Sequence, residues 1–337
     1  DIIQFKPGSY ISLNESKLPK NTSEIEFNRY YHMVYNSIDS TEEIILNNIR
    51  EKLDESIEKR LLSDRPIGCL LSGGLDSSLI TGLVSRKINS RIKTFSVGLE
   101  GAVDLEYARK VSEHLGTDHY EHIISIDDMF DAIPNIIKEI ETYDITTIRA
   151  STPMFLLSKY IKETSDITVL FSGEGSDEAS GSYLYFHNAP DEKSFQDEII
   201  RLMGDLSYFD VLRCDKSTAG AGLEVRVPFL DKSFLNYYLG LLPKFKLPSN
   251  YSMEKYLLRK AFEEYLPEEI TWRRKDGFSD GVSCNEKPWY QIINEYANND
   301  YLPEEEEKFD FNEPILKVPS LIKSFKYNFY ISKYLFI

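Results

Sequence analysis

One glycine-containing turn between two apolar segments constrains the fold of this chain more than any other feature. Residues 72–78 read Ser-Gly-Gly-Leu-Asp-Ser-Ser. They follow the short apolar run 66–71 and precede residues 79–84, whose apolar side chains recur at helical spacing. The sequence therefore predicts a buried strand that ends at this turn and a helix that begins directly after it.

The residue types of this turn suit the binding of phosphate. Glycines let the backbone come close to a ligand, and the amino end of the following helix adds partial positive charge. The three serine hydroxyls can donate to phosphate oxygens, and Asp76 can hold a Mg²⁺ that neutralises them. The Gly-Lys-Ser/Thr of a P-loop is absent from the sequence. An ordinary turn with serine caps is the alternative that these residues alone leave open.

Strand and helix patterns alternate through the first half of the chain. Candidate strands over 93–98, 119–124 and 168–171 follow the one before the turn, with helical patterns between them. This alternation predicts a doubly wound parallel sheet with helices on both faces, whose ligands bind beyond the carboxyl ends of the strands. Beyond residue 194 the strand signal fades, so we expect a mostly helical second half.

A second turn of similar composition follows the apolar run 168–171. Residues 172–178 read Ser-Gly-Glu-Gly-Ser-Asp-Glu and carry three carboxylates. Carboxylates repel a triphosphate unless a metal ion intervenes, so Asp177 facing Asp76 across one Mg²⁺ is a coherent site. Glu174 and Glu178 remain for proton transfer or for holding a cationic group. A solvated acidic turn is the alternative.

Two further segments carry candidate binding groups. Arg273, Arg274 and Lys275 are consecutive, and in so acidic a chain they suit a phosphate clamp, although a basic helix end at the surface is the alternative. Residues 141–153 place many polar groups between two predicted helices, the second of which is expected to begin near Pro153. That density of polar groups suits a small polar substrate, while helix capping is the other explanation.

The net charge and the cysteines indicate which binding partners and which cellular compartment to expect. Lys and Arg number 39 against 55 Asp and Glu, a net charge of −16, which disfavours nucleic acids and anionic membranes because both need clustered cations. No apolar run of about 18 residues and no signal-peptide pattern occurs. Three widely spaced cysteines without metal-ligand spacing favour reduced thiols and a cytoplasmic location; they are Cys69, Cys214 and Cys284.

The amino-terminal segment differs in pattern from the rest. Residues 1–25 combine a β pattern around Pro7-Gly8 with a polar stretch. We expect this segment to be the tail of an upstream domain and a linker, and residues 26–337 to form the main domain. Since the chain begins at Asp1 rather than at a methionine, we also expect its amino end to be a cut within a longer protein.

Together these motifs resemble the glutamine-hydrolysing asparagine synthetases, in the order in which that family carries them. The segments that match are 72–78, 94–101, 141–153, 172–178, 222–231 and 278–282. The likeness covers roughly residues 26–290 and implies the ATP pyrophosphatase fold, similar to the adenine nucleotide alpha hydrolases. Residues 1–25 resemble the end of the family's glutaminase domain, whose catalytic cysteine is not in this chain.

The resemblance implies an ATP-dependent amide ligase of amino-acid biosynthesis. Aspartate would be converted to asparagine through β-aspartyl-AMP, with release of AMP and pyrophosphate. Ammonia would come from glutamine hydrolysis in a covalently linked upstream domain, and ATP and Mg²⁺ would be required. A homodimer is left open. A nucleotide-binding module without synthetase activity and an adenylylating cyclase of the β-lactam synthetase type are the alternatives.

The resemblance also implies roles for individual residues. Glu174, Lys275 and Asp76 would be catalytic: Lys275 would stabilise charge on the leaving pyrophosphate, and Glu174 would serve intermediate formation and amide transfer. Thr147, Arg149 and Asp177 would bind the substrate, with Arg149 suited to a carboxylate. Asp76 and Asp177 would serve the metal. The nucleotide and its phosphates would be contacted by Leu71, Ser72, Gly73, Gly74, Asp76, Ser77, Ser78, Val97, Ser172 and Gly173.

One segment departs from the family pattern. Many relatives carry two large apolar residues directly after the second turn, where this chain has Ala179 and Ser180. If these positions are buried, the smaller side chains are expected to loosen the packing beside the turn by roughly a few kcal/mol. The departure affects the expected activity rather than the expected fold.

Overall fold

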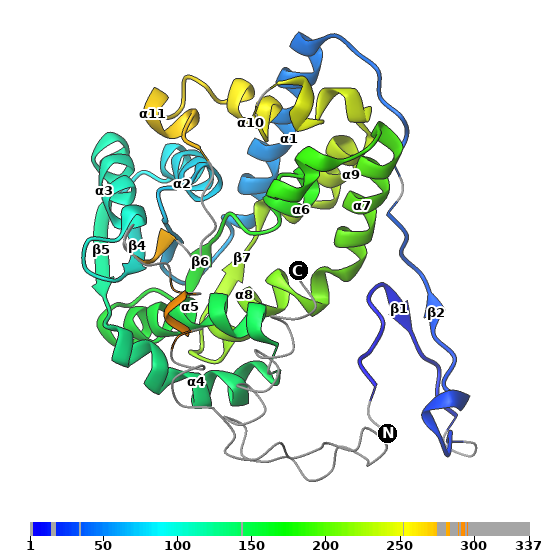
Figure 1. Ribbon diagram of the computed structural model, residues 1–337, viewed down its shortest axis with the longest axis horizontal. Helices are drawn as coiled ribbons and strands as arrows, with labels where there is room; N and C mark the ends of the chain where they lie inside the picture. The colour runs from blue at the N-terminus through cyan, green and yellow to red at the C-terminus, as the bar shows by residue number, and fades with distance from the viewer. Residues whose placement is uncertain are drawn as a thin grey trace.

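A five-stranded parallel sheet forms the centre of the protein in the computed structural model (Figure 1). The structure describes residues 3–14, 18–33, 35–142, 144–251, 253–274, 281–283, 289, 291–293 and 295. The strands are β3 (Ile67–Leu70), β4 (Lys93–Gly98), β5 (Asp118–Ile123), β6 (Val169–Phe171) and β7 (Glu224–Arg226). Their order is β5-β4-β3-β6-β7, and every neighbouring pair is parallel. The predicted doubly wound sheet is confirmed.

The strand order places both predicted turns side by side. β3 pairs with β4 on one side and with β6 on the other. Strands are therefore added first in one direction from β3, as β4 and β5, and then in the opposite direction, as β6 and β7. Ligand sites in such sheets form at this reversal, beyond the carboxyl ends of the strands. The turns after β3 and β6 both lie there. The edge strand β7 was not predicted, because its residues Glu-Val-Arg are mostly polar, whereas the equally short β6 is a continuous apolar run.

Helices cover both faces of the sheet, and strand side chains alternate between two cores. Cys69 and Phe171 belong to the core on the first face, whereas Leu70 and Leu170 belong to the core on the second. On the first face lie α1 (Glu42–Arg60), α2 (Leu75–Lys87), α3 (Val103–Leu115), α9 (Lys232–Gly240), α10 (Tyr256–Ala261) and α11 (Glu268–Thr271). On the second face, grouped at the bottom of Figure 1, lie α4 (Ile126–Ile140), α5 (Ile145–Thr164) and α8 (Asp210–Ala219).

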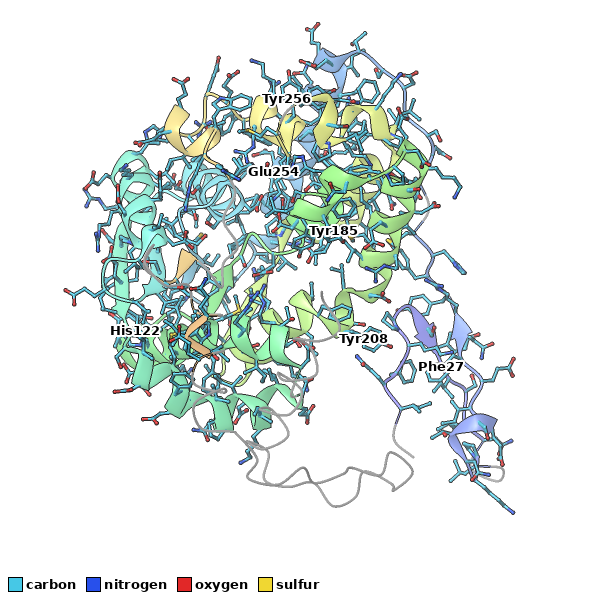
Figure 2. All side chains as sticks on the ribbon, in the orientation of Figure 1. Phe27, His122, Tyr185, Tyr208, Glu254 and Tyr256 are labelled. Carbon is cyan, nitrogen blue, oxygen red and sulfur yellow. The ribbon has the colours of Figure 1, made fainter. Side chains whose placement is uncertain are left out.

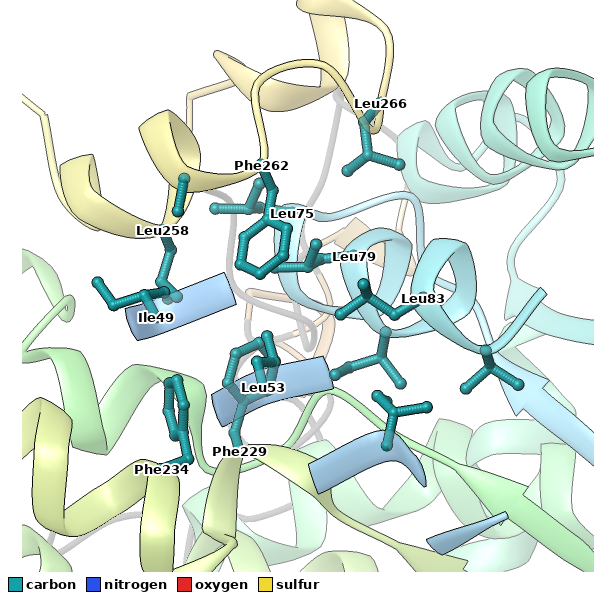
Figure 3. Packing of buried hydrophobic residues seen from close by; sticks show 14 of the residues in the cluster. Ile49, Leu53, Leu75, Leu79, Leu83, Phe229, Phe234, Leu258, Phe262 and Leu266 are labelled. Carbon is teal, nitrogen blue, oxygen red and sulfur yellow. The ribbon is translucent and has the colours of Figure 1, made fainter. Parts of the chain in front are cut away.

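The first core holds α2 and therefore the turn before it. In Figure 3, Leu75, Leu79 and Leu83 form one stripe of α2. They pack among Leu53 of α1 and Phe262, which follows α10, and all of these side chains are almost fully buried. Burial of a leucine or phenylalanine side chain contributes about 1.5–3 kcal/mol. The helix that begins at the first turn is thus anchored along its length.

The described part of the second half is mostly helical, as predicted, and it carries a third core. This core joins α6 (Ser176–Ser180), α7 (Glu192–Asp205) and α9. Ala179 and Ser180 are 1% and 2% exposed, so the condition that these positions are buried is met, whereas looser packing and an effect on activity stay predictions. Short 3-10 turns lie at Thr22–Glu24, Leu184–Asn188, Leu206–Tyr208, Pro228–Leu230, Pro243–Phe245 and Pro248–Asn250.

The amino-terminal segment forms a small sheet of its own. β1 (Ser9–Tyr10) pairs antiparallel with β2 (Asn28–Arg29), and Gly8 before it adopts a φ of +64°. The β pattern around Pro7-Gly8 is confirmed, while the assignment of this segment to an upstream domain stays a prediction. Among the described helices, none combines the length and the apolar character that crossing a membrane requires.

The start of α5 corrects one expectation. The helix begins at Ile145 rather than near Pro153, which lies in its interior. Asp144 is the N-cap, and its carboxylate accepts from the backbone N–H of Thr147 at 2.8 Å. This cap and the burial of several α5 apolar side chains in the second core together offset the cost of the proline in the helix interior. The polar residues expected in a loop are therefore on the first turns of a helix.

Lys246 is buried with neutral acceptors around its ammonium. Among the described residues, Nζ donates to Gln196 Oε1 at 3.1 Å, to the Tyr238 carbonyl at 3.1 Å and to the Leu239 carbonyl at 3.4 Å. Burial lowers the pKa of Lys246 to about 7, because no described carboxylate offsets the cost of desolvating the charge.

We expect Lys246→Met to flatten the pH dependence of stability. The unfolded chain keeps this proton up to its ordinary pKa of 10.5, whereas the folded chain loses it near 7. Between these values the unfolded state binds more protons, so the free energy of unfolding rises with pH, by up to about 1.4 kcal/mol per pH unit. Urea unfolding of both proteins from pH 6 to 9 measures the difference. A constant difference over that range would contradict the assignment.

Candidate active site

A cavity of about 390 Å³ lies at the carboxyl ends of β3, β4 and β6. Both predicted turns open into it. Of the residues implied by the sequence, its walls include Leu71, Ser72, Gly74, Asp76, Ser77, Val97, Arg149, Ser172, Gly173, Glu174 and Asp177. The structure thus brings most of the predicted site together from segments far apart in the chain.

Three predicted residues do not line this cavity, and one lies outside the described chain. Ser78 is fully buried in α2. Thr147 is 4% exposed and donates its hydroxyl to Asp144, so Thr146 lines the cavity instead. Gly73 lies in the first turn but packs against α3. Lys275 is outside the described residues.

The first turn needs glycine at position 73. Gly73 adopts a φ of +74°, and a Cβ there would lie 2.5 Å from the Ala108 nitrogen and from the Tyr107 Cβ. Ser72 and Ser77 close the turn, their hydroxyl oxygens lying 3.0 Å apart. α2 then begins after Gly74 without a side-chain cap. The N–H groups of its first turn lack intrahelical partners and can receive an anion.

The second turn touches the first through Gly173. A Cβ on Gly173 would lie 2.8 Å from the Asp76 carbonyl carbon and from the Ser77 nitrogen, so a larger residue would push the turns apart. Gly175 has a φ of +85°, and a Cβ there would lie 2.3 Å from Leu230 Cδ2. Glycine at position 173 therefore allows the two turns to meet, and glycine at position 175 allows the second turn to pack against Leu230.

The Nζ atom of Lys255 lies between the carboxylates of Asp76 and Asp177. It donates to Asp76 Oδ2 at 2.5 Å and to Asp177 Oδ1, and its side chain is only 2% exposed. Burial by itself lowers the pKa of Lys255, but the Asp177 and Asp76 carboxylates outweigh it and raise that pKa above its usual value. One buried, charged ammonium therefore joins the two turns.

The same two carboxylates fit a Mg²⁺ that a nucleotide helps to bind. Mg²⁺ usually takes one or two protein carboxylates and completes its shell with phosphate oxygens and water. The carboxylate oxygens of Asp76 and Asp177 that point to one region already accept from Lys255, so a Mg²⁺ there would share both carboxylates with this ammonium. Within the described part of the chain, no group of three or more His, Cys, Asp or Glu side chains could hold a metal ion. The donor set thus suits an ion shared with phosphates.

Arg273 and Arg274 add positive charge to the cavity wall. Arg273 donates to the Gly73 carbonyl at 3.3 Å and to Asp104 Oδ1 at 3.2 Å, and its guanidinium lies 3.9 Å from the centroid of the Tyr107 ring. The basic segment that is predicted to clamp phosphate therefore lies beside the first turn. Lys255 had no comparable signal, since it is a single lysine 179 positions from Asp76.

Glu174 is held at the cavity wall by a buried arginine. Arg213 Nη2 donates to both carboxylate oxygens of Glu174, at 3.0 and 2.9 Å. The two side chains are 6% and 17% exposed. Such a pair fixes the position of the carboxylate, because separating buried opposite charges is costly.

Arg149, on the second turn of α5, also reaches this cavity. Its Nε is buried and has no hydrogen-bond partner among the described residues. An unpaired buried donor costs about 1–3 kcal/mol unless a ligand or water completes it. A planar guanidinium in this state suits a ligand carboxylate.

The comparison with known proteins agrees with these motifs. The family model described as asparagine synthase matches residues 48–197 and 188–313. The chain belongs to the asparagine synthase family. It is 41% identical to the asparagine synthetase (glutamine-hydrolyzing) of Homo sapiens over 336 residues, which is 93% of this chain and 60% of that protein. It is 46% identical to that of Gallus gallus over 286 residues, 82% of this chain and 51% of that protein.

The chain thus spans about 60% or less of the length of these relatives. Among solved structures, NMN synthetase from Francisella tularensis aligns with 88% of this chain and 96% of its own, at 12% identity and a TM-score of 0.37. This likeness is too distant to carry an argument about function. The resemblance to the asparagine synthetase family, stated from the motifs, is confirmed.

We expect Gly73→Ala to destabilise the protein far more than Gly74→Ala. Alanine at position 73 combines an unfavourable φ with contacts that are too short, at a cost of about 1–3 kcal/mol or more. Gly74 is the matched control, since its φ is −73° and its nearest Cβ contact is Ser72 Oγ at 3.4 Å. Urea unfolding of the two variants measures this difference, and equal losses would contradict the account of the turn.

Proposed function

We propose that this chain contains the synthetase domain of an asparagine synthetase, an ATP-dependent amide ligase. It converts aspartate to asparagine through β-aspartyl-AMP and releases AMP and pyrophosphate. The observation that supports this most is the meeting of Asp76 and Asp177 at the Lys255 ammonium, beside the uncapped start of α2, in a member of this family. Residues 26–337 form this domain, and its cytoplasmic location is part of the proposal.

The nucleotide lies along the carboxyl edge of the sheet. Leu71, Val97 and the Ser172-Gly173 backbone line the region beside β3, β4 and β6, which suits the nucleoside. The α2 amino end and the hydroxyls of Ser72 and Ser77 face the phosphates, with Gly73 and Gly74 allowing close approach. Ser78, which is buried in α2, supports the phosphate-binding end of this helix.

Positive charge in the wall stabilises the leaving pyrophosphate. Lys255, Arg273 and Arg274 surround the end of the cavity at the first turn, where charge accumulates as the bond between the α and β phosphates breaks. Lys275 adds to this wall in the proposal. A Mg²⁺ held by Asp76 and Asp177 supplies further neutralisation when it is bound with the nucleotide.

Aspartate binds on the α5 side of the cavity. The Arg149 guanidinium receives its α-carboxylate. Thr147, whose hydroxyl donates to Asp144, supports this turn of α5 without lining the cavity. The side-chain carboxylate is then left to attack the α phosphorus. An oxygen–phosphorus bond forms to aspartate, the bond to pyrophosphate breaks, and β-aspartyl-AMP results.

Glu174 serves the second step. Ammonia attacks the acyl carbon of β-aspartyl-AMP, a carbon–nitrogen bond forms, and the bond to the AMP oxygen breaks. Glu174 attracts the nitrogen donor and accepts the one proton that ammonia loses as the amide forms, while Arg213 holds its carboxylate in place. The nitrogen comes from glutamine, hydrolysed in an upstream domain whose tail is residues 1–25.

We expect pyrophosphate release from ATP and Mg²⁺ to require aspartate, and its continued turnover to require a nitrogen source as well. Asp76→Asn should reduce this release by roughly 100-fold or more, because the phosphate end loses an essential charge. Its unfolding midpoint should also fall, because one of the two carboxylates beside the buried Lys255 ammonium is lost, so activity is measured at a temperature well below that midpoint. Asp166→Asn, at an exposed ion pair with Lys93, is the matched control. ATP binding without aspartate-dependent pyrophosphate release would favour a nucleotide-binding module without synthetase activity.

We expect Arg149→Lys to raise the KM for aspartate by roughly tenfold or more, because lysine cannot bind a carboxylate bidentately. The KM for ATP should change by less than about threefold, since the phosphates lie at the other end of the cavity. Steady-state pyrophosphate release measures both constants. Arg109→Lys, at a surface pair with Glu121, is the control. An unchanged KM for aspartate would remove Arg149 from the substrate site.

A further inference from the structure

Arg259 of α10 is an almost fully buried arginine that the proposed reaction does not use. Its side chain is 2% exposed, and it reaches the base of the cavity wall. Its guanidinium donates in two directions. Nε donates to the Glu254 carbonyl at 2.9 Å and Nη2 to the Glu254 carboxylate, whereas Nη1 donates to the carbonyls of Thr271 at 2.6 Å and Arg273 at 3.0 Å.

These four bonds join the two segments that carry the cations. Glu254 directly precedes Lys255, and Arg273 is itself a cation of the wall. Figure 2 labels Glu254 well inside the molecule, whereas Tyr256, two residues later, lies near its edge. The side chain of Glu254 is 9% exposed, so this ion pair is shielded from water. The Arg259 guanidinium therefore holds the Lys255 segment and the Arg273 segment together.

The backbone conformation of Lys255 has to be held by surrounding contacts. Lys255 adopts a φ of +57°, in the left-handed region that side chains other than glycine rarely occupy. A residue held there costs about 1–3 kcal/mol and persists only where its surroundings determine it. Arg259 donates to both the carbonyl and the carboxylate of Glu254, the residue before Lys255, and these bonds hold the backbone in place on that side.

Arg273 connects the contacts of Arg259 to the first turn. Its backbone carbonyl accepts from Arg259, while its guanidinium donates to the Gly73 carbonyl and to Asp104. A shift of this segment would therefore displace a cation of the wall together with its contact to the turn. Lys255 and Arg273 depend on Arg259 from opposite sides.

We propose that Arg259 is a positioning residue for the phosphate end of the site. It holds the Lys255 and Arg273 segments at a set distance, so that their cations meet the triphosphate and the leaving pyrophosphate. Arginine suits this role because its planar fork donates in several directions, whereas a lysine ammonium donates from one point. The inference rests on the proposed function, because it assigns these cations to the phosphates.

The test compares Arg259→Lys with Arg50→Lys. Arg50 donates to the carbonyl of Ala261, the last residue of the same helix, so its replacement loosens α10 without touching the cation-bearing segments. Glu254→Gln is a milder second variant, since it keeps the shape of the side chain and removes its charge. Binding of ATP with Mg²⁺ by calorimetry and the KM values for ATP and aspartate are measured, together with unfolding midpoints.

We expect Arg259→Lys to weaken ATP binding and raise the KM for ATP by roughly 10- to 100-fold, with the KM for aspartate changed by less than about threefold. Glu254→Gln should shift the same constants in the same direction. Arg50→Lys should lower the unfolding midpoint without raising the KM for ATP. In a Lys255→Met background, Arg259→Lys should weaken ATP binding less than it does alone, because its effect passes in part through Lys255.

Equal rises in both KM values, or additive effects with Lys255→Met, would overturn the proposal in favour of a general structural tie. Unchanged ATP binding in both Arg259→Lys and Glu254→Gln would also overturn it. If the unaltered protein binds ATP but shows no aspartate-dependent turnover, only the proposed function fails, and the ATP affinities still decide this inference. If it binds no ATP, both fail.

Discussion

The buried ammonium of Lys255 between Asp76 and Asp177 is the interaction on which the site depends. Each partner comes from a different part of the fold: one from the turn after β3, one from the turn after β6, and one from the segment before α10. A buried charge is tolerated only when opposite charges surround it at close range. The strand order, the contact made by Gly173 and the tie through Arg259 all bring these three groups within reach of one another.

The electrostatics of the site differ from those of the whole chain. The protein carries a net charge of −16, whereas the described cavity lining has six Lys and Arg side chains against six Asp and Glu side chains, and the cations include Lys255, Arg273 and Arg274. The described contacts also pair buried cations with acidic side chains, as in Arg273 with Asp104 and Arg259 with Glu254. This pairing holds the cations in place before a ligand arrives. A phosphate ligand then meets positive charge that is already positioned, so little reorganisation accompanies binding.

Local patterns predicted the sheet and the two turns correctly because each depends on neighbouring residues. Apolar runs that end at glycines mark buried strands whatever lies elsewhere in the chain. The same reasoning was wrong at Pro153, where the Asp144 cap, only nine positions earlier, starts the helix sooner. It did not find β7, because this strand has two charged residues out of three and is defined by its pairing with β6. Nor did it find Lys255 or Arg259, whose roles come from contacts with segments far away or with buried carbonyls.

The sequence by itself determined the family, the parallel sheet and the turn of residues 72–78 with the acidic turn that accompanies it, since these are encoded in short stretches of residue type and order. Only the tertiary structure decided which cation meets Asp76 and Asp177, and that Arg259 ties together the segments that hold this cation. The physical reason is that an ion pair in a protein interior depends on distance and burial. Neither quantity is set until the sheet and the helices around it have packed.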